Sequence, residues 1–219
     1  MKARKILVSL AALALVAAIS IGGTLAYLTN SKTVTNTFTV GNVTIKLDET
    51  KTNTDGTPVT PATRTEQGNQ YKLIPGGTYT KDPTVTVIPG SEESYVRLIV
   101  KVSDVTDALK AFGEGYDLSN IFRGFNDKWS RYGKVQTSED GKTLTYEYRY
   151  ATAVTPTSGP KSDGVLEPLF TSVQIPGTLT DAQYAALNNL NIEITAEAVQ
   201  AAGFNGDVNA AWQGFATQK

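Results

Sequence analysis

The sequence predicts an all-β protein with short helical insertions, folded as an antiparallel sandwich of two sheets. Roughly eight segments of strand length carry alternating or continuous apolar residues. Pro-Gly and Asp-Gly pairs separate several of these segments and are typical of tight turns. No long helical pattern alternates with the strands, as a parallel α/β sheet would require. With 40% hydrophobic and 19% charged residues, the chain has enough apolar material for one core.

The first 26 residues have the pattern of a signal peptide. A basic start, Met1–Lys5, precedes the apolar run Ile6–Ile21, and two glycines then lead to Thr24-Leu25-Ala26. Small residues at Thr24 and Ala26 predict cleavage between Ala26 and Tyr27. The alternative is a retained membrane anchor, but the apolar run is shorter than the ~20 residues that span a bilayer. We therefore expect secretion, with no membrane attachment after processing.

Two strand patterns follow the cleavage position. Thr33–Val40 is rich in Thr and Val, and Gly41 separates it from Asn42–Asp48. In the second pattern Val43, Ile45 and Leu47 share one face, and Thr44, Lys46 and Asp48 share the polar face. The polar stretch 50–70 then predicts a long exposed loop or a mobile hairpin tip.

The middle of the chain predicts the main sheet. Short strands are expected at Tyr71–Ile74 and Thr84–Ile88, each followed by a Pro-Gly turn. Tyr95–Val102 is the most apolar of the predicted strands and indicates a central strand covered on both faces. Asp104–Phe112 and Leu118–Phe125 predict short helices or turns.

A β-hairpin is predicted at Trp129–Thr137 and Lys142–Tyr150, across the turn that contains Asp140-Gly141. In its second strand Leu144, Tyr146, Tyr148 and Tyr150 share one face. This aromatic row fits either a platform for sugars or cross-strand packing, and packing is the simpler interpretation.

The C-terminal third predicts apolar residues of 165–175 in the core and a short helix opened by a capping box at Thr180. The final strand, Asn191–Ala201, places Ile192, Ile194, Ala196 and Ala198 on one face. A last helical turn is expected at Asp207–Phe215.

The composition excludes several kinds of chemistry. The chain has no Cys and no His, so disulfides, the commonest metal ligand and His-based catalysis are absent. Acidic pairs occur at Glu92-Glu93, Asp104 with Asp107, and Glu139-Asp140, without the spacing of an EF-hand. Removing the signal peptide takes away three of 20 basic residues and none of 21 acidic ones, which disfavours nucleic acid. We expect no enzyme, and no catalytic, cofactor or metal site.

Three stretches together resemble the TasA/camelysin family: the export segment with GTLAYLTNSKTVTNTFTVGNVTIKLDE, LIPGGTYTKDPTVTV with SYVRLIVKV, and EITAEAVQAAGF. Between Ser103 and Thr180 no family motif is found. The resemblance implies a jelly-roll-like β-sandwich over residues 42–219 and processing by a signal peptidase of the SipW type. It also implies secretion to the extracellular matrix or cell surface of a Gram-positive bacterium. The metalloprotease activity described for camelysin has no support in a chain without His.

For TasA the family implies biofilm matrix fibres that grow by donor-strand exchange. Carried over, residues 27–41 form the donor segment, with Tyr27, Leu28, Val34, Phe38 and Val40 as its apolar residues. The partners are then further copies of the same chain, head to tail, and possible matrix or anchor proteins. Two alternatives stay open: the segment folds back onto its own sheet, or the protein is a monomeric surface module that binds carbohydrate or protein.

Overall fold

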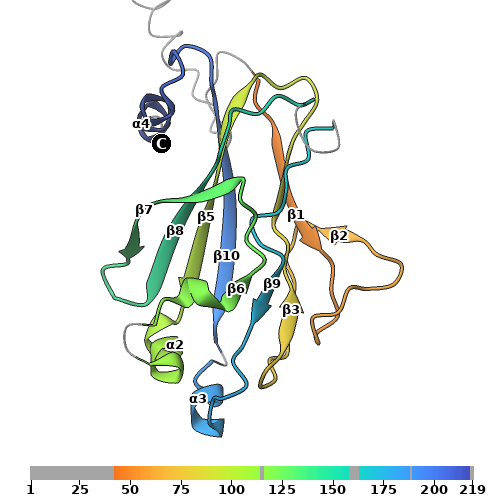
Figure 1. The fold of residues 1–219 in the computed structure, drawn as a ribbon, viewed down its shortest axis with the longest axis vertical. Helices are drawn as coiled ribbons and strands as arrows, with labels where there is room; N and C mark the ends of the chain where they lie inside the picture. The colour runs from red at the N-terminus through yellow and green to blue at the C-terminus, as the bar shows by residue number, and fades with distance from the viewer. Residues whose placement is uncertain (1–41, 114–115, 158–162, 188, 218–219) are drawn as a thin grey trace, which may run out of the picture. The chain divides into compact units, whose positions relative to one another are not determined.

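The structure is a computed structural model that describes residues 42–113, 116–157, 163–187 and 189–217 (Figure 1). These residues are predominantly β, in three antiparallel sheets with few helices. The strands are β1 Ile45–Thr50, β2 Arg64–Thr65, β3 Thr78–Thr80, β4 Thr84–Val87, β5 Ser94–Ser103, β6 Phe122–Arg123, β7 Trp129–Thr137, β8 Thr143–Tyr150, β9 Ser172–Gln174 and β10 Asn191–Gln200. The helices are α2 Val105–Phe112, the 3-10 helix η1 Leu118–Ile121, α3 Asp181–Ala185 and α4 Val208–Ala216.

The largest sheet has the order β10-β5-β8-β7. β5 lies between two partners and pairs with β10 along its whole length, from Ser94 opposite Gln200 to Ser103 opposite Asn191. Its even-numbered residues from Ser94 to Val102 are buried, while Ile99 on the other face is partly exposed and Lys101 is exposed. The prediction of a central strand is therefore confirmed. The prediction that both faces are covered holds only in part, because α4 covers the outer face near Arg97 while Lys101 is exposed.

Two smaller sheets have the orders β2-β1-β4 and β3-β9-β6. β4 also meets the segment around Gly164, whose carbonyl accepts a hydrogen bond from the amide of Val87 (2.9 Å). Gly164 has a φ of 77°, and a Cβ atom there would lie 2.1 Å from the Val87 carbonyl oxygen. Only glycine allows the backbones to approach this closely. The described residues thus form three sheets where two were expected.

One hydrophobic core joins the three sheets. Buried side chains come from β4 (Val85 and Val87), from β5 (Leu98 and Val100) and from the 165–175 segment, including Phe170. A separate small cluster attaches α4 to the other face of the large sheet; it contains Val199, Ala211 and Trp212. The expected apolar role of residues 165–175 and the final strand is confirmed.

Local signals predicted most elements well. The hairpin β7–β8, the capping box of α3 at Thr180 and the C-terminal helix all occur near their expected positions. Tyr71–Ile74 forms no strand, and Leu118–Phe125 forms a 3-10 turn followed by the short β6. The first described strand begins at Ile45 instead of Asn42.

The stretch 50–70 is mostly exposed, as expected, but it is tied to the sheet rather than extending freely. Within it β2 pairs with the end of β1, and the amide of Lys51 donates to the Thr63 carbonyl (2.9 Å). The amide of Lys72 donates to the Thr54 carbonyl (2.7 Å). The prediction of a mobile hairpin tip missed these attachments.

Candidate strand-acceptor edge

The predicted cleavage residues Ala26 and Tyr27 and the other predicted donor residues lie outside the described part of the chain. The structure therefore leaves the donor segment itself untested. What it does describe is the surface that could receive a strand. Such a surface needs unpaired backbone groups along a strand edge and apolar side chains that are incompletely buried.

β10 has an unpaired edge within the described residues, since its partner in the sheet is β5 alone. The amide of Ala201 donates to the Glu93 carbonyl beside β5 (2.8 Å). Because backbone direction alternates along an antiparallel strand, the groups of Ile192, Ile194 and Ala196 point to the opposite edge. The N–H and C=O groups of these residues are thus presented in a row for a further strand.

The same residues carry side chains on the core face that stay partly exposed. Ile192, Ile194 and Ala196 pack against the core without being fully buried, whereas Ala198 is buried. β1 lies near β10, and in Figure 1 the two strands lie close at the top of the view and separate below. No backbone pairing joins them in the part of the chain that is described. An added strand could therefore cover these apolar side chains.

The opposite edge of the large sheet, at β7, has different properties. Its pairing with β8 is interrupted by a bulge between Tyr132 and Gln136, where Gly133 has a φ of 68°. Nearly all side chains of β7 are exposed, and they include Arg131 and Lys134. Bulges and exposed basic residues are features that discourage pairing at an edge. β10 has no bulge, proline or lysine along its ten residues.

The tyrosine row of β8 faces the core. Tyr146 and Tyr148 are 1% and 4% exposed, and Tyr148 packs against Phe125 with ring centroids 5.4 Å apart. Burial raises the pKa of Tyr148 to about 12. A sugar platform made by these rings is thus excluded, and the packing interpretation is confirmed.

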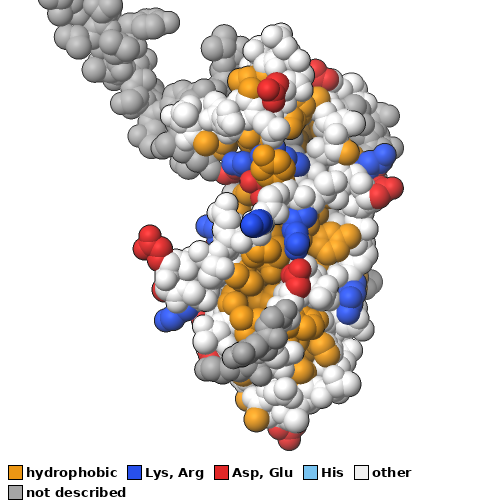
Figure 2. Space-filling model, turned by 60° about the vertical axis from the view of Figure 1, so that its left-hand side comes forward, with side chains coloured by type: hydrophobic (Ala, Val, Ile, Leu, Met, Phe, Trp, Pro, Cys, Tyr) orange, Lys and Arg blue, Asp and Glu red, His pale blue; other side chains and the backbone are white. Residues whose placement is uncertain are grey.

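Figure 2 turns the β7 side forward and shows hydrophobic side chains that reach the surface there.

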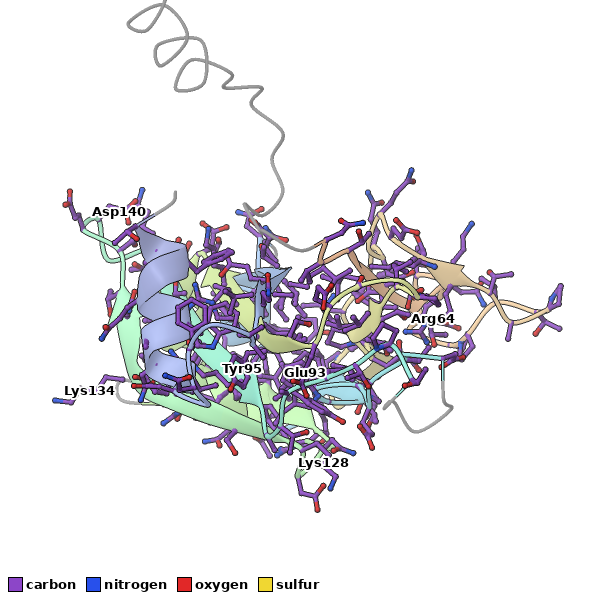
Figure 3. All side chains as sticks on the ribbon, turned by 90° about the horizontal axis from the view of Figure 1, so that it is seen from above. Arg64, Glu93, Tyr95, Lys128, Lys134 and Asp140 are labelled. Carbon is purple, nitrogen blue, oxygen red and sulfur yellow. The ribbon has the colours of Figure 1, made fainter. Side chains whose placement is uncertain are left out.

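Charged side chains at the end of β1 form a network that the sequence did not predict. Asp48, which was expected on an exposed polar face, is buried together with its neighbour Glu49. Lys81 Nζ lies 2.7 Å from Glu49 Oε2, and both side chains are more than nine-tenths buried. Arg64, labelled in Figure 3, joins Asp48 to Asp82, which it meets at 2.9 Å. Five residues from three segments (48–49, 64 and 81–82) thereby bring opposite charges together.

The network shifts the ionisation of its members. Burial alone would raise the pKa of Asp48, but hydrogen bonds from Arg64 and Lys46 hold it below its ordinary value. Asn69 donates to Glu49 Oε1 and to the Thr50 carbonyl, both at 2.8 Å, and so attaches the end of the long loop. This arrangement is structural, since the buried charges are paired with one another.

Two of the acidic pairs noted in the sequence lie at a turn and at a helix start. Asp140 accepts hydrogen bonds from the Ser138 hydroxyl and the Lys142 amide in the β7–β8 turn. Asp104 directly precedes α2, and its carbonyl accepts from the Ala108 amide. In the described ranges, no three acidic side chains come together as metal ligands would.

Comparison with known protein families, curated proteins and solved structures finds no match to this chain. Among the helices that the structure describes, none is long and apolar enough to cross a membrane.

Proposed function

We propose that this chain is a secreted structural subunit of extracellular matrix fibres, assembled head to tail by donation of its N-terminal segment. The observation that carries the proposal is the edge of β10 with which no other strand of the described residues pairs. There it combines backbone groups that point away from β5 with partly exposed apolar side chains, and it lacks the bulge and basic residues of β7. In this proposal a signal peptidase of the SipW type frees residues 27–41, and the large sheet belongs to a jelly-roll-like sandwich.

The donor pattern suits this acceptor edge. Phe38 and Val40 are two residues apart, so on an added strand both face the same side. They would cover Ile192 and Ile194, while the donor's backbone pairs with β10. Because donor and acceptor are different surfaces, the contact does not close on itself and propagates into a filament.

Two variants test the two halves of this contact. Deletion of residues 27–39 removes the donor. Ala196→Pro removes a backbone donor from the unpaired edge of β10 while the hydrogen bonds with β5 remain. The matched control is Thr137→Pro, which places proline on the unpaired edge of β7, where Thr137 is exposed. We expect wild type and the control to form filaments and heat-resistant ladders, and the other two to remain folded monomers.

Mixing the two deficient variants separates donation in trans from folding back in cis. Ala196→Pro subunits keep the donor, and the deletion variant keeps the acceptor edge. Together they should form heterodimers that cannot elongate, measurable by light scattering and electron microscopy. Normal filaments from the deletion variant, or mixtures that stay monomeric, would refute donation in trans. The second outcome would favour the alternative of a monomeric surface module.

A further inference from the structure

The outer face of the large sheet contains a groove that the proposed assembly does not use. The groove has a volume of about 540 Å³ and lies over β10, β5, β8 and β7. Its floor follows two rows of residues that face one another across the strands. One row contains Lys101, Thr145 and Gln136, and the next contains Thr195, Ile99, Glu147 and Tyr132. The second row crosses all four strands, a width of roughly 14 Å.

The helix α4 covers the third row of this face and closes one end of the groove. Arg97 lies 4.2 Å above the Trp212 ring, and Arg149 donates to Asn209 (2.9 Å). Both guanidinium groups are also neutralised: Arg97 pairs with Glu197 at 2.6 Å, and Arg149 pairs with Glu147 at 2.6 Å. The arginines and glutamates are thus occupied with one another.

The lysines of the groove are in a different situation. Lys101 and Lys134 are exposed, and neither forms an ion pair with a described carboxylate. Glu193 lies opposite Lys101 in the register without coming within ion-pair distance. Lys134 belongs to the β7 bulge and projects from the domain on the side of α4 (Figure 3). Two positive charges therefore remain available at a groove whose other charges are compensated.

The remaining lining suits sugar rings. Thr145, Thr195 and Gln136 offer hydroxyl and amide groups, and Ile99 provides an apolar floor. The Tyr132 ring is 45% exposed at the border of the groove, and the Arg149 guanidinium packs on it with its carbon 3.3 Å from the ring centre. A rigid aromatic ring beside hydrogen-bonding groups is a common way to orient a polar ligand.

From this geometry we infer that the outer groove binds an acidic polysaccharide, with Lys101 and Lys134 contacting its carboxylate groups. The hydroxyl and amide groups of the floor bind sugar hydroxyls. The two lysines stand among hydroxyl and amide groups, which matches a polymer whose sugars carry several hydroxyl groups beside each carboxylate. A nucleic acid, with one phosphate per nucleotide, is bound through many more cationic contacts.

The test measures the binding of hexagalacturonate, used as the probe, to the purified protein by titration calorimetry at low salt. The double variant Lys101→Gln with Lys134→Gln removes the two charges from the groove. A matched control, Lys51→Gln with Lys72→Gln, removes two exposed lysines from the long loop and its end. We expect the groove variant to bind at least tenfold more weakly, with unchanged melting temperature, and the control to bind as wild type does.

Two further ligands define the chemistry. Neutral maltohexaose should bind much more weakly than hexagalacturonate, and a single-stranded DNA hexamer should not compete. Undetectable binding of hexagalacturonate to wild type, equal loss in both lysine variants, or stronger binding of DNA would each overturn the inference. The groove variant should still form filaments, so this outcome is independent of the proposed assembly.

Discussion

Replacing Lys81 with Met should strongly destabilise the domain. Lys81 Nζ is 2.7 Å from Glu49 Oε2, and the two side chains are 9% and 8% exposed. Without the ammonium group, the carboxylate stays buried with the Asn69 amide as its one described side-chain donor. Removing one partner of a buried ion pair typically costs about 3–5 kcal/mol. Since small domains are stable by only ~5–15 kcal/mol, the loss would be a large fraction of the total.

Urea unfolding at neutral pH measures this cost as a shift in midpoint at constant slope. The double variant Lys81→Met with Glu49→Leu removes both charges, so it should be much closer to wild type than Lys81→Met alone. Lys46→Met is the matched control: Lys46 pairs with Asp48 at 2.9 Å, but its side chain is 42% exposed. Its midpoint should hardly move. A loss below about 1 kcal/mol for Lys81→Met, or additive losses in the double variant, would refute the role given to this pair.

Three other predictions concern stability in acid, a backbone position that requires glycine, and removal of the signal peptide. The pKa of Asp48 is lowered in the folded state, so its stabilising effect is present above the unfolded value near ~3.9 and is lost as pH falls through the lower folded value. Asp48→Asn should flatten the fall in urea midpoint below about pH 4, and an unchanged pH profile would contradict this. Gly164→Ala should cost about 2 kcal/mol or more, because its Cβ would meet the Val87 carbonyl. At Gly141 (φ 70°) nothing lies within 4 Å of the added Cβ, so Ala there should cost about 1 kcal/mol; equal losses would refute the argument. Ala26→Asp should block signal-peptide removal, and N-terminal sequencing of secreted protein that still begins at Tyr27 would show otherwise.

The elements that the sequence predicted correctly depend on local signals. Asp140-Gly141 fixes a turn between two strands, and Thr180 with Gln183 forms a capping box within one helical turn. The alternation of Ile192, Ile194 and Ala196 determines the inner face of β10 without reference to any other segment. In each case the residues that decide the structure lie within a few positions of one another.

The features that the sequence could not predict depend on partners far along the chain. Asp48 follows the polar positions of its strand, yet Arg64 of a separate segment donates to its carboxylate and compensates for its burial. Ile99 belongs to an apolar run that suggested cover on both faces. In the fold, α4 covers only the end of β5 near Arg97, and Ile99 becomes the floor of a groove. No periodic pattern in the sequence indicates which part of β5 is covered by α4.

The two edges of the large sheet explain why assembly in one direction is physically reasonable. A flat, unprotected strand edge normally risks uncontrolled pairing, and proteins disrupt such edges with bulges and charges. This sheet has a bulge at Gly133 and the exposed Lys134 on β7, whereas β10 has no bulge and no basic residue, and its charged side chains are Glu193 and Glu197. If both edges were open, subunits could join through either and would form irregular aggregates. Among the described residues, one protected edge and one open edge leave a single position for an added strand on this sheet. A chain that donates one segment and accepts one segment can then only grow as a linear, polar filament.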